Sequence, residues 1–204
     1  MADAPLARVR GLRRLSGIDR SGGPPLETLR GQPLRPWTIP NAIGYVRIAL
    51  LAAFAVDVFV SDDSHPLLAI LFALVAWGDH FDGLAARLTG QYSRLGALMD
   101  PAIDRALVIA GVVATWRLDL LPRWALAVLV AREALMLVLG PWQLRRGYDL
   151  QISMLGRWAV WPTMSAIFFA LCDVDGLDAA LLYVGLAMTL AATAQYARQL
   201  STSA

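Results

Sequence analysis

The chain has 204 residues, of which 57% are hydrophobic and only 17% are charged. A soluble domain of this length needs more polar surface than that, so the composition predicts a membrane protein with one domain. The net charge of +2 is too small to indicate a nucleic-acid partner, and the single cysteine, Cys172, excludes an internal disulfide and a cysteine-based metal site.

Residues 1–36 form an arginine-rich leader that also contains many Gly, Pro and Ser residues. No apolar run follows its first basic residues closely, as it would in a secretory signal, so we expect a cytoplasmic and partly disordered leader. Two interpretations of its arginines remain open. One is contact with anionic lipid, and the other is a solvated tail without a role.

Six apolar stretches are candidates for crossing a bilayer, which takes about 20 residues of helix. These stretches are Ile43–Val60, Pro66–Leu88, Ala97–Trp116, Leu121–Leu139, Ile152–Leu171 and Asp178–Tyr196. The connections between them are short, so consecutive helices should run antiparallel. The sequence therefore predicts an all-α, polytopic membrane domain over residues 37–198, with a short tail at residues 199–204.

Charges in the connections predict the orientation of these helices. Arginines concentrate in the leader, in Arg87–Arg94, in the Arg145–Arg146 loop and at Arg198, all on one side of the predicted membrane. The opposite side is richer in aspartate. By the positive-inside rule, the arginine-rich side and both termini are cytoplasmic.

Two of the predicted spans carry pairs of aspartates at or near their cytoplasmic ends. Asp79 and Asp82 are three residues apart, and Asp100 and Asp104 are four apart, so each pair lies on one helical face. Four carboxylates facing one another in a low-dielectric setting cannot all stay ionised unaided. A divalent cation resolves the conflict, and ligation by oxygen alone favours magnesium, manganese or calcium.

Each carboxylate also has a structural interpretation, since a lone aspartate in a membrane can pair with an arginine such as Arg87 or Arg105. Four at these spacings favour function, because charged groups within a membrane are costly. The small residues Gly83, Ala86 and Gly96 have two interpretations as well. They either remove bulk beside the carboxylates or allow close helix packing.

Together these residues resemble the signature of the CDP-alcohol phosphotransferases. The match, without departure, is Asp79-x2-Asp82-Gly83-x2-Ala86-Arg87-x8-Gly96-x3-Asp100-x3-Asp104. The segment Ile39-Pro40-Asn41-Ala42-Ile43-x3-Arg47 is similar to the first membrane helix of phosphatidylglycerophosphate synthases and related cardiolipin synthases. The Arg132-Glu133 and Gly156-Arg157 pairs also look like pairs found there, although Arg157 replaces a more usual lysine. The resemblance extends from Trp37 to Arg198.

The resemblance implies a six-helix, homodimeric membrane enzyme that transfers the phosphatidyl group of CDP-diacylglycerol to an alcohol. It implies that Asp79, Asp82, Asp100 and Asp104 hold two Mg²⁺ or Mn²⁺ ions in a cavity that faces the cytoplasm. Asp104 would also accept the proton of the acceptor hydroxyl, with a purely ligating role as the alternative. The residues that would bind the CDP-lipid are Pro40, Asn41, Ala42, Ile43, Gly83, Ala86, Arg87, Ser93 and Gly96.

The acceptor remains open between glycerol 3-phosphate, which we place first, phosphatidylglycerol and inositol phosphate. Arg132 and Arg157 are predicted to bind its phosphate, because an unpaired guanidinium within a span is costly. Pairing of these arginines with a carboxylate or a helix C-terminus is the alternative. Glu133 adjoins Arg132, but adjacent helical positions do not face each other, so it need not neutralise Arg132.

Two other classes of protein compete with the enzyme interpretation. A six-span cation channel or transporter would also carry aspartates inside the membrane. A non-catalytic scaffold on the same fold is the second. The channel or transporter would not need the spacing of Gly83, Ala86, Arg87 and Gly96. The scaffold would have no reason to keep all four aspartates.

Overall fold

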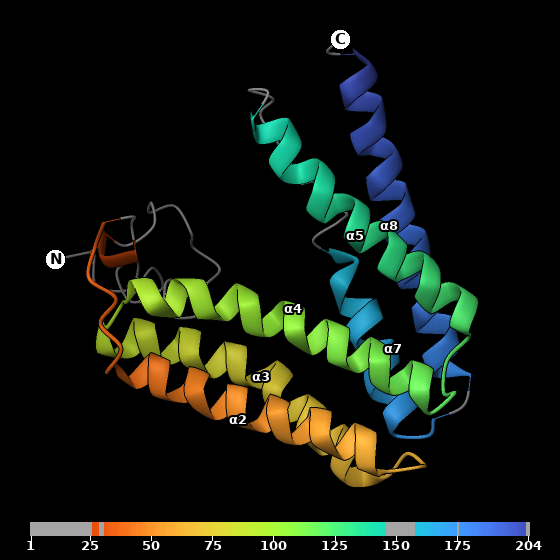
Figure 1. Cartoon of the computed structure of the whole chain (residues 1–204), viewed down its shortest axis with the longest axis horizontal. Helices are drawn as coiled ribbons and strands as arrows, with labels where there is room; N and C mark the ends of the chain where they lie inside the picture. Colours follow the sequence, from red (N-terminus) through yellow and green to blue (C-terminus); the bar gives the residue numbers. More distant parts are fainter. Residues whose placement is uncertain (1–25, 29–30, 146–157, 175, 203–204) are drawn as a thin grey trace, which may run out of the picture. The chain divides into compact units, whose positions relative to one another are not determined.

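The computed structural model describes residues 26–28, 31–145, 158–174 and 176–202 (Figure 1). All regular structure in these residues is helical, with six α-helices and one 3₁₀ turn and no strand. The 3₁₀ turn is Leu26–Thr28, and the α-helices are α2 (Ile39–Val60), α3 (Pro66–Thr89), α4 (Arg94–Arg117), α5 (Arg123–Arg145), α7 (Val160–Leu171) and α8 (Leu177–Thr202). The predicted all-α class is confirmed.

The six helices coincide with the six predicted spans, with differences at their ends. Helix α2 begins four residues earlier than predicted, and α8 continues to Thr202. Residues 152–157 of the fifth predicted span and residues 1–25 of the leader lie outside the described residues. By length and composition, α2, α3 and the Leu177–Gln195 part of α8 can cross a membrane, and α7 is a shorter apolar helix. A crossing by all six helices stays a prediction.

Helices α4 and α5 are less apolar than the others because charges interrupt them. Arg94, Asp100, Asp104, Arg105 and Arg117 lie in α4. A charged residue in a span is costly unless it faces the interior of the bundle or a functional cavity. The charges in the first half of α4 therefore indicate that this half faces the interior of the bundle or a functional cavity.

Local sequence explains where the helices begin. The Thr38 hydroxyl accepts a hydrogen bond from the Asn41 amide at 3.3 Å and caps α2. Helix α3 starts with Pro66, whose missing N–H and fixed φ suit the first helical turn. Ser93 caps α4 by accepting a hydrogen bond from the Gly96 amide at 2.9 Å.

Pro101 lies inside α4 directly after Asp100, where it removes one helical hydrogen bond.

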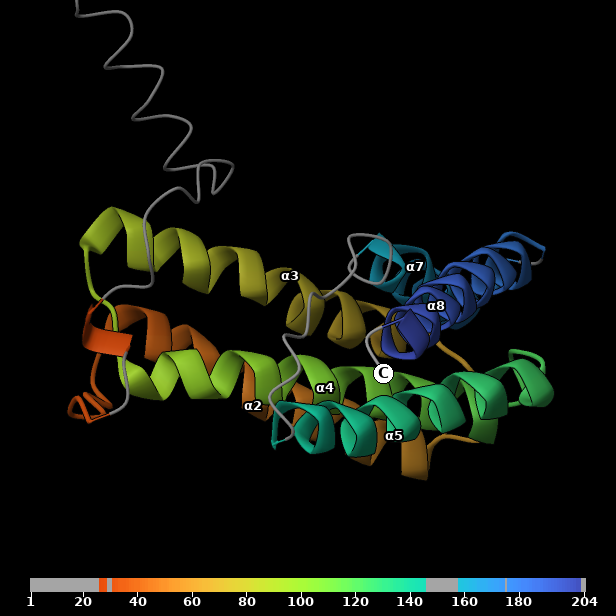
Figure 2. The ribbon, with the colours of Figure 1, turned by 90° about the horizontal axis from the view of Figure 1, so that it is seen from above.

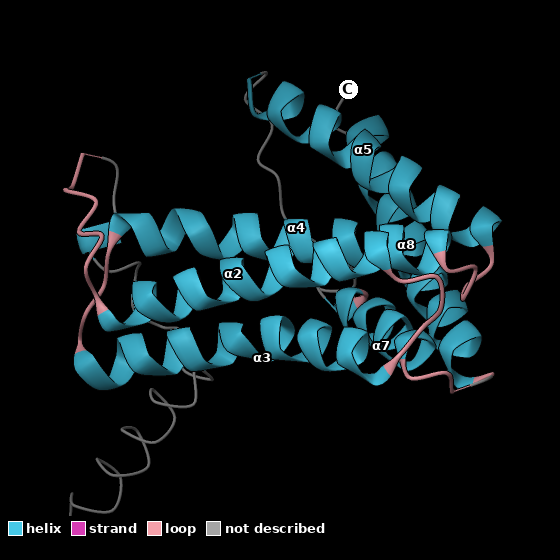
Figure 3. Cartoon of the chain, turned by 60° about the horizontal axis from the view of Figure 1, so that its bottom comes forward, coloured by secondary structure: helices cyan, strands magenta, loops and turns pink. Residues whose placement is uncertain are grey.

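The chain divides into two compact units. The first contains residues up to Val56 and Leu71–Leu107, so it includes most of α2, most of α3 and the first half of α4. These three segments run side by side (Figures 1 and 3). Apolar side chains from all three form the buried core of this unit. They include Phe54, Phe72, Val75, Ile103 and Leu107.

The second unit contains Asp57–Ile70 and the residues from Val108 onward. Helices α7 and α8 pack together in it, as Figure 2 shows. Gly185 of α8 lies against α7, where an added Cβ would be 3.0 Å from the Thr163 backbone nitrogen. A small residue at this position allows the two helices to approach closely.

Large apolar side chains are exposed along several helices. Trp77 is 68% exposed, Ile109 63% and Trp124 59%. Soluble monomers rarely leave so many large apolar side chains in contact with water. Together with the apolar helices, this surface is that of a membrane protein.

Candidate functional site

Three of the four aspartates of the signature meet around the side chain of Arg47. Asp79 and Asp82 come from α3 and Asp104 from α4, whereas Arg47 comes from α2. The Arg47 Nη1 atom is 2.8 Å from Asp82 Oδ2 and 3.8 Å from Asp79 Oδ1. Its Nη2 atom is 2.8 Å from Asp104 Oδ1. The structure thus brings together carboxylates that the sequence placed on two helices.

Asp100, the fourth aspartate, belongs to the same group of charges. It lies within electrostatic range of Asp79, Asp82, Asp104 and Arg47. Four carboxylates therefore share one nearby guanidinium, which leaves a surplus of negative charge when all are ionised. Asp79 and Asp104 have half-exposed side chains, whereas Asp82 is buried.

Arg47 is buried almost completely, with 1% of its side chain exposed. Its Nε atom donates to the Val75 carbonyl at 3.1 Å, and its two terminal nitrogens donate to Asp82 and Asp104. All three guanidinium nitrogens thus have partners. A buried arginine is tolerated when its donors are satisfied and its charge is paired.

The carboxylates are not arranged as ligands of a metal ion in this structure. No three acidic, histidine or cysteine side chains of the described residues form such a group. The guanidinium of Arg47 stands between them instead. The chemistry of the set still suits a hard divalent cation, because the oxygens are anionic and the negative charge exceeds the positive.

Two residues of the predicted donor site, Asn41 and Ser93, are hydrogen-bonded to each other. Ser93 Oγ donates to Asn41 Oδ1 at 2.8 Å, and Asn41 Nδ2 donates to the carbonyls of Arg35 and Pro36. Both side chains are buried. Gly96 completes the arrangement, because a Cβ at this position would be 2.9 Å from Asn41 Oδ1. These three residues hold the start of α2 against the start of α4.

Arg87 and Gly83 of the signature lie next to each other on α3. A Cβ on Gly83 would be 3.6 Å from Arg87 Nη1, so the guanidinium covers the glycine. The Arg87 Nε atom is buried and has no hydrogen-bond partner among the described residues. An unsatisfied buried donor on a cation is costly and favours a bound anion.

The remaining predicted donor-binding residues are on the same helices. Pro40, Ala42 and Ile43 lie in the first turns of α2, and Ala86 lies one turn after Asp82 in α3. The first unit therefore contains every residue predicted to bind the metal ions or the CDP-lipid.

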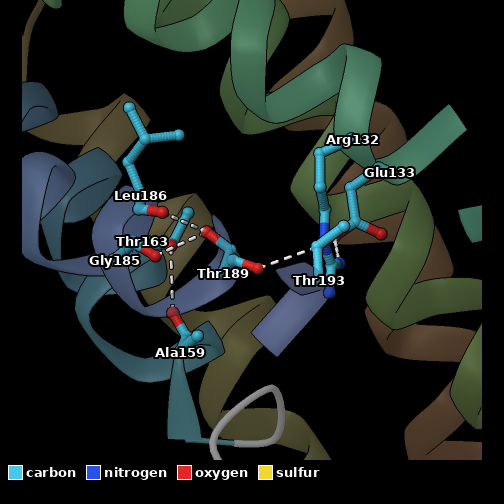
Figure 4. A network of polar contacts seen from close by, with 8 residues as sticks. All are labelled: Arg132, Glu133, Ala159, Thr163, Gly185, Leu186, Thr189 and Thr193. Carbon is cyan, nitrogen blue, oxygen red and sulfur yellow. Dashed lines mark hydrogen bonds and ion pairs between the residues drawn. The ribbon is translucent and has the colours of Figure 1, made fainter. Parts of the chain in front are cut away.

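Arg132 lies in the second unit, within a network of polar contacts between α5 and α8 (Figure 4). Its Nε atom donates to Thr193 Oγ1 at 3.2 Å, and Thr193 Oγ1 in turn donates to the Thr189 carbonyl at 2.9 Å. Its Nη1 atom pairs with the Glu133 carboxylate. Arg132 thus pairs with a carboxylate, which was the alternative interpretation from the sequence, because its long side chain reaches Glu133 although their Cβ atoms diverge. Arg157 lies outside the described residues.

Sequence reasoning gave no role to Arg47, which appeared only inside the matching segment, and it did not consider Gly78. A signal for Arg47 was present, because it is the only basic residue of α2 and an arginine in a span requires a partner. Gly78 gave no such signal, since its importance depends on which side chain lies against it.

Comparison with known proteins shows the family to which this chain belongs. Residues 37–191 match the family described as CDP-alcohol phosphatidyltransferase. A Streptomyces coelicolor protein named cardiolipin synthase (CMP-forming) is 37% identical over 169 residues, which cover 78% of each chain. A putative cardiolipin synthase of Mycobacterium tuberculosis is 32% identical over 68% of each chain. A CDP-diacylglycerol–glycerol-3-phosphate 3-phosphatidyltransferase of Bacillus subtilis is 30% identical over 64% of this chain and 75% of its own.

Proposed function

Because this chain belongs to the CDP-alcohol phosphatidyltransferase family, we propose that it transfers the phosphatidyl group of CDP-diacylglycerol to a hydroxyl of a phosphate-bearing glycerol. The chain is thus an enzyme of phospholipid biosynthesis. The observation that carries the specific proposal is the convergence of Asp79, Asp82 and Asp104 around Arg47, with Asp100 in electrostatic range.

In the proposed reaction, the acceptor oxygen attacks the phosphorus that bears the lipid. A new phosphorus–oxygen bond forms, the bond to the cytidine monophosphate oxygen breaks, and CMP leaves. Asp104 accepts the proton of the acceptor hydroxyl. Its side chain is 50% exposed and Arg47 contacts one of its two oxygens, so the carboxylate remains accessible to an acceptor.

The four aspartates would also hold the Mg²⁺ or Mn²⁺ ions of the family resemblance, two in number. Bound ions of this kind supply Lewis-acid stabilisation of a diphosphate and its leaving group. Support for this part comes from the surplus of carboxylates over arginine and from their placement on two neighbouring helices. The guanidinium of Arg47 offsets one of the four negative charges.

Arg87 would contact a phosphate of the CDP group. Its buried Nε atom, which has no hydrogen-bond partner in the part of the chain that the structure describes, and the absence of a side chain on Gly83 support this role. Asn41 and Ser93 would contact the donor as predicted only after their present hydrogen bonds broke, because both side chains are already bonded within the protein. Their role in the proposal is to position α2 against α4.

The membrane arrangement is part of the proposal. The six helices cross the cell membrane, both termini are cytoplasmic, the site faces the cytoplasm and the enzyme is a homodimer. The arginine bias of the connections supports the orientation. The exposed apolar side chains support contact with lipid.

Two acceptors are candidates, and each presents a glycerol hydroxyl together with a phosphate. Glycerol 3-phosphate is the acceptor that we placed first from the sequence, and relatives at 29–30% identity are named for it. Phosphatidylglycerol is the second, because the relative at 37% identity is named a cardiolipin synthase. In both cases Arg132 and Arg157 would bind the acceptor phosphate, for which Arg132 would have to exchange its present contacts with Glu133 and Thr193.

The test is to incubate the purified protein with CDP-diacylglycerol, Mg²⁺ and, separately, glycerol 3-phosphate, phosphatidylglycerol or inositol phosphate. Release of CMP with a matching lipid product, identified by mass, supports the proposal and selects the acceptor. Phosphatidylglycerophosphate would identify the first acceptor and cardiolipin the second. No CMP release with any acceptor would overturn the proposal.

A further inference from the structure

We propose that Arg47 is a positioning residue of the site, which fixes the carboxylates of Asp82 and Asp104 relative to each other through one guanidinium. This inference rests on the proposed function and adds to it a residue outside the aspartate signature. Three observations carry it: the hydrogen bonds of Arg47, the space that Gly78 leaves for it, and the separate helices from which its partners come.

The hydrogen bonds of Arg47 leave the guanidinium little freedom. Nη1 and Nη2 donate to Asp82 and Asp104 at 2.8 Å each, while Nε is held by the Val75 carbonyl. Because the guanidinium is planar and its nitrogens are fixed, the two carboxylate oxygens that it contacts are fixed as well. The Val75 carbonyl anchors this group to the backbone of α3.

Gly78 provides the space that Arg47 occupies. A Cβ at position 78 would be 2.6 Å from Cγ of Arg47 and 2.7 Å from its Cδ. These are the inner atoms of a side chain whose far end is held at three points, so they cannot move aside without breaking those bonds. Any residue larger than glycine at this position would therefore displace the guanidinium.

The Arg47 guanidinium connects two helices, α3 and α4, that carry different aspartates of the site. Asp82 is on α3 and is 5% exposed, whereas Asp104 is on α4 and is 50% exposed. Arg47 holds one oxygen of each, so it orients the accessible carboxylate against the buried one. Catalytic groups lose much of their efficiency when their geometry shifts by about 1 Å.

Arginine is required for this role because lysine presents a single nitrogen. An ammonium at position 47 would retain the positive charge but could not serve Asp82, Asp104 and Val75 along three fixed directions. The substitution Arg47→Lys therefore keeps the positive charge but removes the geometry of the guanidinium. The substitution Arg47→Gln removes both.

The experiment compares full-length wild type with Arg47→Gln, Arg47→Lys and Gly78→Ala. Gly44→Ala is the matched control, because it adds the same methyl group within a helix but meets only the terminal methyl of the flexible Met99 side chain. Three quantities are measured in detergent: Mn²⁺ affinity by electron paramagnetic resonance without substrate, CMP release at saturating Mn²⁺, and thermal unfolding of the metal-free protein.

We expect Arg47→Gln to bind Mn²⁺ at least as tightly as wild type, because a positive charge has left the carboxylates. Its turnover should nevertheless fall by about a hundredfold, since Asp104 is no longer oriented. Gly78→Ala should lose turnover to a similar extent, Arg47→Lys should recover only part of it, and Gly44→Ala should match wild type.

Wild-type turnover in both Arg47→Gln and Gly78→Ala would overturn the inference. A joint loss of Mn²⁺ binding and thermal stability in Arg47→Gln and Gly78→Ala would also overturn it, because that result indicates a role in folding alone. If Arg47→Gln does not fold, Arg47→Lys and Gly78→Ala decide. If wild type releases no CMP, the proposed function fails, and the Mn²⁺ spectrum then decides: a spectrum unchanged by Gly78→Ala overturns the positioning role, and an altered one supports it.

Discussion

Ser93 donates a hydrogen bond to Asn41, a residue 52 positions earlier in the chain, and both side chains are buried. The bond connects the N-terminal cap of α4 to the first turn of α2. Asn41 in turn binds the carbonyls of Arg35 and Pro36, so one pair of side chains fixes the start of two helices and the segment before them.

Replacing Ser93 with alanine should destabilise the protein by about 1–3 kcal/mol, because the buried Asn41 oxygen and the Gly96 amide both lose a partner. The measurement is thermal or denaturant unfolding in detergent. Thr89→Ala is the control, since Thr89 is exposed and its hydroxyl bonds only nearby backbone, the Ala85 carbonyl and the Gln91 amide. Equal stability of the two variants would contradict a role for the Ser93–Asn41 bond.

Asparagine in place of Asp79, Asp82 or Asp100 should abolish CMP release while the protein still folds, because each change removes an anionic ligand from the proposed metal site. Turnover is measured over a range of Mg²⁺ concentrations, with folding checked by size-exclusion chromatography. Asp119→Asn is the control, since its carboxylate is exposed and pairs with Arg123 across the connection between α4 and α5. A variant with near-normal turnover would exclude that aspartate as a ligand.

The predicted orientation can be tested by labelling single cysteines in intact cells with a reagent that does not cross membranes. The native Cys172 is exposed and is first replaced by alanine. A cysteine at Ser64 should react, whereas cysteines in the leader or at Arg145 should react only after the membrane is opened. The opposite pattern would place both termini outside and would separate the site from the cytoplasm.

Arg132→Gln should raise the Michaelis constant for the acceptor far more than that for CDP-diacylglycerol, because the predicted role of Arg132 is to bind the acceptor phosphate. Arg123→Gln is the matched control on the same helix. Arg123 is exposed, and its one ion pair among the described residues is with Asp119. Equal effects on both substrates would indicate that Arg132 serves only the network with Glu133 and Thr193.

Alanine at Gly185 should lower the stability of the protein by about 1–3 kcal/mol, because its Cβ would press against the backbone of α7 and force the two helices apart. A Cβ at this position would be 3.3 Å from Thr163 Cα, which cannot rotate away. Thermal unfolding measures the loss. The Gly44→Ala variant should unfold near the wild-type temperature, and similar behaviour of the two variants would contradict the close approach of α7 and α8.

The helices and the aspartates were predictable because both depend on patterns that are local in sequence. Apolar stretches gave the helices, and spacings of three and four residues put Asp79 with Asp82 and Asp100 with Asp104. Helix ends were less predictable. Helix α2 begins at Ile39 because Thr38 provides a cap and Pro40 suits the first turn, whereas the apolar run alone begins later.

The partner of the aspartates was not predictable from spacing. Arg47 is 35 residues from Asp82 and 57 from Asp104, and no periodicity connects positions so far apart. The contact depends on the packing of three helices and on the space left by Gly78. For Arg132, pairing with a carboxylate was one of two interpretations from the sequence, which did not require Glu133 to be the partner. Backbone direction alone does not limit where a long, flexible side chain can reach.

The separation of Arg47 from its partners also bears on how the protein is made. The ribosome adds Arg47 before either Asp82 or Asp104 exists, so α2 reaches the membrane with an uncompensated charge. The apparent cost of an arginine at the centre of an inserting helix is about 2.5–3.5 kcal/mol. Arg47 is the ninth residue of α2, close enough to its start for the side chain to extend toward the lipid headgroups before α3 and α4 are present. We expect its side chain to enter the protein interior only when α3 and α4 supply Asp82 and Asp104, which would make assembly of the three helices and completion of the site a single event.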